Sequence, residues 1–381
     1  MPQSPLTFDL AGRAVLTLAG EGAGSDGYVR SQMDPFHPGA AAPGIPEVRL
    51  ECRASVASAR LVERQGPAGD GVVTASDGSR PLIVRSGRAC SLPDALRDGP
   101  ARFEFEPGFP LAGIFGPVVR PALQIAMLAG QSTALHASSV ELDGGGLAIA
   151  GWSESGKTET ALAFMEDGAR FISDKWTVLG PDGTLSAFPI GVGVRRWVLS
   201  HLPRLRSSLA PAARSRLAVA RLASVAGSAL RLTPPRAGGS VQLARELAER
   251  AVSLAERVPV TPRELRSAYG QEHEPTLSAP LRAVVVLTTA PGPGVVAEPA
   301  DPVWAAERMV RSAAFERAPY FGLQERACYA FPGRDRGTRE EVVALERDLL
   351  ERALRATTVI GVHAPFPADP RPVASAIARC L

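Results

Sequence analysis

Apolar and polar residues alternate in short runs over the first third of the chain. Such alternation is typical of half-buried strands, and it predicts strands at residues 14–18, 48–52, 81–85 and 102–105. Clusters of glycine and proline between the runs indicate turns, and the stretch 37–46 is predicted to be an exposed loop. We find no repeat and no catalytic motif here, so the pattern predicts a β-rich region over residues 1–115.

Strand and helix patterns mix irregularly after this region. Residues 117–129 have a helical pattern, with Pro117 suited to its first turn and Gly130 to its end. Apolar runs predict further strands at residues 134–140, 147–150, 281–287 and 357–362. The first two of these strands flank a glycine-rich turn at 143–146 and are predicted to form a hairpin.

Three more helices are predicted from their opening residues. Asp301, before a proline, opens a helix to about residue 315. Thr338 and Glu341 form a capping box for a helix to about residue 356, and Asp369 opens a short final helix. The mixture predicts an α/β or α+β domain over residues 116–381.

Composition narrows the class of protein. With 45% hydrophobic and 21% charged residues among 381, the chain can bury a sizeable core, and disorder is not predicted. No apolar run approaches the roughly 18–20 residues of a membrane-spanning helix, and the first five residues lack the pattern of a secretory signal. The four cysteines are far apart and suit free thiols. We therefore expect a soluble, cytoplasmic protein with no membrane partner.

Charge is distributed unevenly although the net charge is only +3. Of the 42 basic residues, only Lys157 and Lys175 are lysines. Residues 183–245 contain no Asp or Glu but ten arginines, which predicts a basic lobe on an otherwise acidic protein. Part of this lobe is predicted to be an arginine-rich helical insertion at about residues 195–250. Such a surface suits an acidic partner.

Residues 151–158 match the phosphate-binding pattern G-x-x-x-x-G-K-[ST] at every fixed position. The segment reads Gly151-Trp152-Ser153-Glu154-Ser155-Gly156-Lys157-Thr158, followed by Glu159. Its glycines allow backbone N–H groups to curl around phosphate oxygens, and the next helix points its positive end at them. The Lys157 ammonium is expected at the β/γ-phosphates and the Thr158 hydroxyl at Mg²⁺. The sequence therefore predicts ATP and Mg²⁺ as cofactors.

The loop and its surroundings resemble the C-terminal kinase domain of bacterial HPr kinase/phosphorylase. That family shares its nucleotide-binding core with ATP-dependent phosphoenolpyruvate carboxykinase. The resemblance rests on the loop, the glutamate after it, the helix ending at Gly168, Asp174 closing the next strand, and the upstream His136. It covers residues 134–180 and continues loosely in element order to about residue 290. It implies the fold of this core and a serine/threonine kinase activity.

The chain departs from this family in two places. The family has an Asp-Asp pair where this chain has Asp174-Lys175. The family's glycine-rich arginine signature, which contacts the protein substrate, is not recognisable here. HPr itself is therefore not the expected substrate.

The candidate catalytic residues are Lys157, Asp174, His136 and Lys175. Asp174 is expected to ligate the metal together with Thr158, or to accept the proton of an attacking hydroxyl; alternatively it is a turn aspartate. His136 is expected to orient the γ-phosphate or the substrate, or else is a packed strand histidine. Lys175 is interpreted as a second cation for phosphate or an acidic substrate, or alternatively as an outward-facing lysine on an alternating strand.

Three further features have two interpretations each. Arg195 and Arg196 are predicted to return to the site as a phosphate or substrate clamp, or to be a solvated pair. Trp152 packs over nucleotide or over protein. The arginine-rich pattern at 212–232 suits an acidic peptide or a plain solvated helix face. Nucleic acid is not favoured, because aromatic residues are not interleaved with the arginines.

The sequence thus predicts an ATP-dependent kinase that phosphorylates a Ser/Thr hydroxyl of an acidic protein or peptide. A ribosomally made peptide is one candidate, because HPr-kinase-like proteins also modify such peptides. Two alternatives stay open: a small-molecule phosphotransferase, and a non-catalytic, nucleotide-gated peptide-binding module. The second is prompted by Lys175 in place of an aspartate. A homo-oligomer is also left open.

Overall fold

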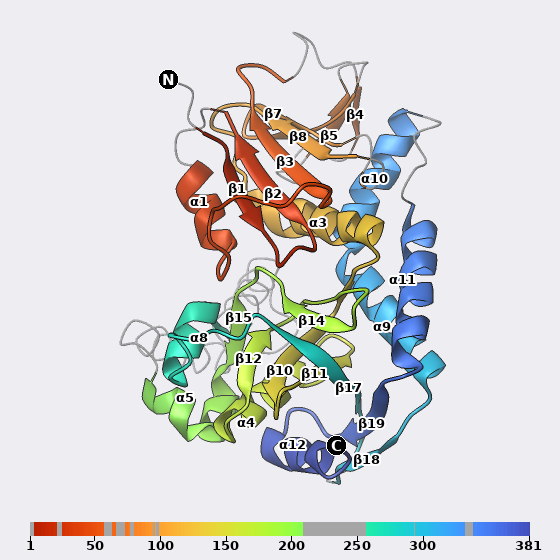
Figure 1. Cartoon of the computed structure of the whole chain (residues 1–381). Coiled ribbons are helices and arrows are strands. Elements are labelled where there is room, and N and C mark those ends of the chain that lie inside the picture. Colours follow the sequence, from red (N-terminus) through yellow and green to blue (C-terminus); the bar gives the residue numbers. More distant parts are fainter. Residues whose placement is uncertain are drawn as a thin grey trace, which may run out of the picture.

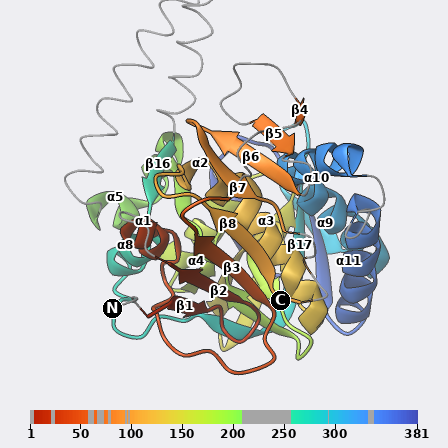
Figure 2. The same cartoon turned by 90° about the horizontal axis from the view of Figure 1, so that it is seen from above.

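The computed structural model describes residues 4–20, 25–56, 63–65, 73–76, 80–93, 96, 99–208, 257–292, 294–331 and 338–381. The fold is a mixed α+β arrangement in which one β-sheet lies above a second sheet flanked by helices (Figure 1). Both views place helices α9 (Pro302–Glu316), α10 (Ala318–Ala330) and α11 (Arg339–Leu354) along the same side of the molecule (Figure 2).

The N-terminal sheet has the strand order β1-β2-β3-β8-β7-β6-β5-β4. Its strands are β1 Leu6–Asp9, β2 Val15–Ala19, β3 Glu47–Cys52, β4 Glu63–Gln65, β5 Val73–Ser76, β6 Pro81–Arg85, β7 Arg88–Ser91 and β8 Ala101–Phe105. Helix α1 (Ser25–Gln32) connects β2 to β3. The four strands predicted from alternation are confirmed as β2, β3, β6 and β8, and the predicted loop at 37–46 is mostly exposed.

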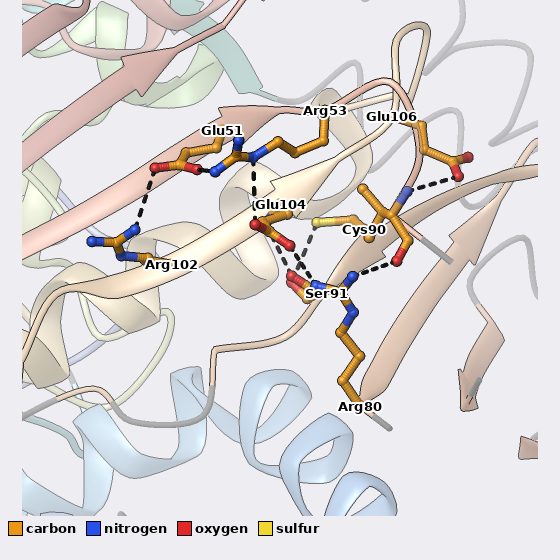
Figure 3. A network of polar contacts seen from close by, with 9 residues as sticks. Glu51, Arg53, Arg80, Cys90, Ser91, Arg102, Glu104 and Glu106 are labelled. Atoms are coloured by element: carbon orange, nitrogen blue, oxygen red, sulfur yellow. Dashed lines mark hydrogen bonds and ion pairs between the residues drawn. The ribbon is translucent and has the colours of Figure 1, made fainter. Parts of the chain in front are cut away.

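The alternation in β3 and β8 separates a buried face from a charged one. The apolar residues, all essentially without exposed surface, are Val48, Leu50, Phe103 and Phe105. On the charged face, Glu51 pairs with Arg53 and with Arg102, and Glu104 pairs with Arg53 and Arg80 (Figure 3). Several of these charged side chains pair between neighbouring strands, and such pairs stabilise a sheet face.

A continuous helical segment connects the two sheets. It consists of α2 Ala112–Ile114, the π-helical turn η1 Phe115–Val119, α3 Arg120–Ala126 and the 3₁₀ turn η2 Met127–Gly130. The predicted start at Pro117 is wrong, because the helical segment begins at Ala112 and Pro117 lies within its π-helical turn.

The same segment corrects the prediction about membrane spans. By length and composition alone, Ala112–Gly130 could cross a membrane, and 67% of its most apolar stretch is buried inside the protein. Arg120 and two prolines interrupt its sequence, so it contains no long unbroken apolar run. Burial of this kind is typical of the core helix of a soluble protein. The four cysteines are free, as predicted.

The second sheet has the order β12-β10-β11-β17-β14-β13-β9, and β19 pairs with β17 and β18. Its strands are β9 Thr133–Leu135, β10 Ala137–Leu142, β11 Gly145–Gly151, β12 Arg170–Ser173, β13 Thr177–Leu179, β14 Thr184–Ala187, β17 Ser278–Thr289, β18 Val296–Pro299 and β19 Thr358–Ala364. The predicted hairpin is confirmed as β10 and β11, and β17 runs parallel to both β11 and β19. The single strand predicted at 134–140 is instead broken at His136, because β9 pairs with β13 and β10 pairs with β11.

Helices cover both faces of this sheet. On one face, α4 (Lys157–Glu166) and α12 (Pro370–Ala378) pack against alternate residues of β11 and β17, including Ile149 and Val285. On the other face, α9 and α11 pack against the intervening residues, including Ala150 and Val286. The three predicted helix starts are confirmed, since Asp301, Thr338 and Asp369 each accept a backbone N–H at a helix N-terminus.

A small two-stranded sheet lies beside α4. It contains β15 (Val192–Arg195) and β16 (Arg257–Val260). Along the chain, η3 Arg196–Ser200 and α5 Pro203–Ser208 come after β15, and α8 Pro262–Ala268 comes after β16. The arginine-rich helical pattern at 212–232, and most of the predicted insertion at 195–250, lie outside the described residues.

Candidate functional site

The segment between β11 and α4 is a tight loop that requires glycine at both ends. Gly151 has φ +153° and Gly156 has φ +94°. A Cβ atom on Gly151 would lie 2.5 Å from Ser155 Oγ and 2.8 Å from the carbonyl oxygen of Leu287, and one on Gly156 would lie 3.3 Å from the Phe366 ring. The loop therefore curls closely at the start of α4, where the unpaired N–H groups of a helix gather.

Lys157 is buried inside this loop. Its ammonium donates hydrogen bonds to the carbonyl oxygens of Gly151, at 3.1 Å, and Trp152, at 2.6 Å. Burial lowers the pKa of Lys157 to about 8, and Lys175 lowers it further, although nearby carboxylates led by Asp174 oppose the shift. The Lys157 ammonium is thus held at the first two residues of the loop.

Asp174 joins the loop to the end of β12. Its Oδ1 accepts a hydrogen bond of 2.8 Å from Thr158 Oγ1 and one of 2.5 Å from Ser138 Oγ. Asp174 is 4% exposed. It is therefore not an isolated turn residue, since it fixes the first turn of α4 against β10 and β12. Ser138 was not predicted, although it stands two residues after His136 in the sequence.

His136 lies where the chain crosses from β9 to β10, and it is almost fully buried. Its Nδ1 is 2.7 Å from Ser312 Oγ, which in turn donates a 3.0 Å hydrogen bond to the carbonyl oxygen of Gly151. Burial, with the charges of Lys157 and other cations, lowers the pKa of His136 to about 2. The imidazole is therefore neutral, and it contacts the loop through α9.

Lys175 is neither on a strand nor without a partner. It follows β12 in the left-handed backbone region, with φ +60°, and its Nζ lies 3.2 Å from Glu316 Oε2. The strand placement in the alternative interpretation is therefore wrong, because the turn after Asp174 directs the Lys175 side chain to the end of α9, although the side chain is exposed as that interpretation expected. Its side chain is 48% exposed.

Of the two arginines predicted to return to the site, the structure places only Arg195 at the loop. Arg195 pairs with Glu154 at 2.7 Å and approaches Glu159 Oε1 at 3.5 Å, so it does return to the loop, but it contacts the loop's acidic residues. Arg257 also pairs with Glu154, at 3.0 Å. Arg196 begins η3, and its side chain makes no hydrogen bond or ion pair with the described part of the chain. Arg195 is thus positioned beside the start of α4, whereas no such contact supports Arg196.

Trp152 packs over protein. Its ring lies 4.7 Å from that of Phe315, centroid to centroid, and each of the two side chains is about half exposed. Beneath Trp152 is a cavity of about 150 Å³ between the ends of β11 and β17 and the helix α9. It is lined by Gly151, Trp152, Val286, Leu287, Arg308, Met309 and Arg311.

The residues fit the cofactors predicted from the sequence. Ser155 Oγ is buried without a hydrogen-bond partner among the described residues, and it lies in the curl of the loop where a phosphate oxygen would be expected. In the described part of the chain, no three His, Cys, Asp or Glu residues form a metal cluster. Thr158 and Asp174 instead provide a pair of oxygen ligands, which suits Mg²⁺ because it usually retains water and phosphate ligands.

The long-range partners Ser312 and Glu316 were missed by the sequence analysis. Both lie on α9, four residues apart, so they share a helix face. That helix was predicted, but no local pattern links it to a loop more than 150 residues earlier.

Comparisons with models of protein families and with curated proteins find no match to this chain. The functional assignment therefore rests on the geometry of the site.

Proposed function

We propose that the protein is a Mg·ATP-dependent kinase with a core like that of HPr kinase/phosphorylase and phosphoenolpyruvate carboxykinase. The observation that carries this proposal is the convergence of Lys157, Asp174 and His136 on a glycine-ended loop at a helix N-terminus. Phosphoryl transfer needs positioning and charge neutralisation more than covalent catalysis, and this cluster provides both. The acceptor is a Ser/Thr hydroxyl of a protein or peptide, with an acidic peptide preferred.

Each residue has a role in the proposal. Lys157 neutralises the β/γ-phosphates when ATP is bound, because its ammonium already lies inside the loop. Thr158 and Asp174 hold Mg²⁺. His136, being neutral, orients groups by hydrogen bonding instead of by charge. Lys175 is a second cation close enough to influence Lys157, and it compensates for part of the triphosphate charge.

Transfer of labelled phosphate tests the proposal. Purified protein is incubated with γ-labelled ATP, Mg²⁺ and acidic peptides that carry Ser or Thr. Label on a peptide hydroxyl is expected, and Lys157→Ala should abolish it. Arg282→Ala is the matched control, because this residue pairs with Asp143 at the opposite end of β11. Full activity of Lys157→Ala would remove the basis for the site.

The same assay separates the two alternatives. Tight ATP binding without transfer to any acceptor supports a nucleotide-gated binding module. Transfer to small hydroxyl compounds, but not to peptides, supports a small-molecule phosphotransferase, for which the cavity of about 150 Å³ beside Trp152 is the candidate acceptor site.

A further inference from the structure

Two hydrogen-bond acceptors face each other beside the loop. Ser312 has one hydroxyl proton, and it donates this proton to the carbonyl oxygen of Gly151, which can only accept. Ser312 Oγ must therefore accept from Nδ1 of the neutral His136. The second ring nitrogen, Nε2, is consequently unprotonated, and it lies 3.8 Å from Oε1 of Glu316.

This pair lacks a donor. A separation of 3.8 Å is too long for a hydrogen bond, and Nε2 makes no hydrogen bond with any residue that the structure describes. The His136 side chain is 4% exposed and that of Glu316 is 15% exposed, so few water molecules can reach Nε2. A water molecule between the two atoms could donate one hydrogen bond to each of them.

Glu316 is held in place by its helix and by Lys175. It is the last residue of α9, and one turn earlier Ser312 attaches that helix to the loop. Its Oε2 pairs with Lys175 at 3.2 Å, which leaves Oε1 directed at His136. The carboxylate is also close enough to affect Lys157, so it belongs to the end of the loop at which the β/γ-phosphates are expected.

The other carboxylates of the site have different partners. Oδ1 of Asp174 already accepts hydrogen bonds from two hydroxyls, Ser138 and Thr158. Glu159 lies at the start of α4 beside Arg195. His136 cannot serve as the proton acceptor, because burial and neighbouring cations lower its pKa to about 2. Because the proposal assigns Asp174 to Mg²⁺ together with Thr158, Glu316 is the carboxylate beside His136 that holds no metal.

We propose that Glu316 is the general base of the phosphoryl transfer, taking the proton of an acceptor hydroxyl that lies between its Oε1 and Nε2 of His136. This rests on the proposed kinase function. The acceptor oxygen forms a bond to the γ-phosphorus while the bond from that phosphorus to the bridging oxygen of ADP breaks. The hydroxyl proton passes to Glu316 and then to solvent. Without a substrate, a water molecule occupies the position and donates to both atoms.

The water is the first test, and it requires no activity. A high-resolution crystal structure of the ligand-free protein should show a water within about 3.2 Å of both Nε2 of His136 and Oε1 of Glu316. A Glu316 carboxylate turned away from His136, with no donor between them, would overturn the proposal.

Phosphate release from γ-labelled ATP, with water as acceptor, is the second test. Glu316→Gln should slow release by roughly 100- to 10,000-fold, the usual contribution of a general base, with the Kd for Mg·ATP unchanged. Glu307→Gln is the matched control, because Glu307 lies on the same helix but pairs with Arg311 and Arg347. An unchanged rate in Glu316→Gln overturns the base assignment alone. No ATP binding by the wild-type protein overturns the proposed function, and with it this inference.

Discussion

Thr158 Oγ1 donates a hydrogen bond of 2.8 Å to Oδ1 of Asp174, across sixteen residues of sequence. The intervening segment is α4, the turn at Gly168 and β12, and it returns the chain to the start of the helix. The hydroxyl predicted from the loop motif and the carboxylate predicted from the family resemblance are therefore adjacent. This adjacency makes the metal assignment testable.

Asp174→Asn should weaken binding of Mg·ATP much more than binding of metal-free ATP. The amide keeps one oxygen but loses the charge that attracts the cation, so we expect a loss of about 1.5–3 kcal/mol, close to that of a charged hydrogen bond. Isothermal titration with and without Mg²⁺ measures both affinities. Asp182→Asn is the control, because Asp182 pairs with Arg13 away from the loop. Equal losses with and without Mg²⁺ would contradict the metal role.

Gly156→Ala should destabilise the fold and also abolish tight ATP binding. An L-residue at φ +94° costs roughly 1–2 kcal/mol, and the new Cβ would lie 3.3 Å from Phe366, which distorts the loop. Gly168→Ala is a matched control, because Gly168 has φ +104° and its Cβ would meet nothing within 4 Å. Chemical denaturation should show similar losses in both variants, and ATP titration should separate them. Normal ATP affinity in Gly156→Ala would show that the loop tolerates a side chain.

Arg317 and Glu346 form a buried ion pair that joins α11 to the segment between α9 and α10. Nη1 of Arg317 lies 2.7 Å from Oε1 of Glu346, and both side chains are essentially without exposed surface. Arg317 also donates to Gln124 and to the carbonyl oxygen of Ala134. Burial raises the pKa of Glu346, and Arg317 opposes this shift. The guanidinium is thus the main charge partner of a fully buried carboxyl.

Arg317→Met should therefore lower the free energy of unfolding by about 3–5 kcal/mol, because it leaves Glu346 buried without its partner. The double variant Arg317→Met/Glu346→Leu should recover much of the loss, since a well-packed apolar pair replaces the ions. Urea denaturation of the single and double variants measures the coupling. A double variant as unstable as the sum of its single changes would show that the two charges act independently.

Local motifs were predicted well, and contacts between distant segments were not. The loop at 151–158 and the N-terminal residues of α9, α11 and α12 depend on neighbouring residues, so sequence spacing is enough to find them. His136 shows the limit. The sequence predicted one strand over residues 134–140, yet the chain changes position in the sheet at this residue. The pattern of apolar and polar residues indicates which residues are buried. His136 is buried even though it lies between two strands, so this pattern does not reveal the break.

Contacts between distant segments of the site also could not be predicted from the sequence. Glu316 was an ordinary residue at the end of a predicted helix until the fold placed it beside His136 and Lys175. A salt bridge between segments so far apart in sequence has no local pattern. The direction of Lys175 depended in turn on the left-handed backbone at that residue, which a lysine adopts only where the surrounding structure stabilises it.

His136 should make the protein less stable as the pH falls from 7.5 to 5.5. Its pKa is about 2 in the folded protein, whereas an unfolded histidine has a pKa near 6.5. Because the folded-state pKa is lowered, the unfolded chain binds a proton below pH 6.5 that the folded protein does not. The stabilisation is therefore fully present above pH 6.5 and is lost as the pH falls, by about 1.4 kcal/mol at pH 5.5.

Urea denaturation of the wild-type protein and of His136→Gln at pH 7.5 and 5.5 measures this effect. The variant has no imidazole to titrate at this position, so its stability should change less between the two pH values, by about 1.4 kcal/mol. His273→Gln is the control, because the His273 side chain is 92% exposed. In the wild-type protein, the ¹⁵N resonances of His136 should also stay those of the neutral Nδ1–H tautomer from pH 7.5 to 5.5. Protonation of His136 within that range would contradict its role as a neutral group that connects α9 to the loop.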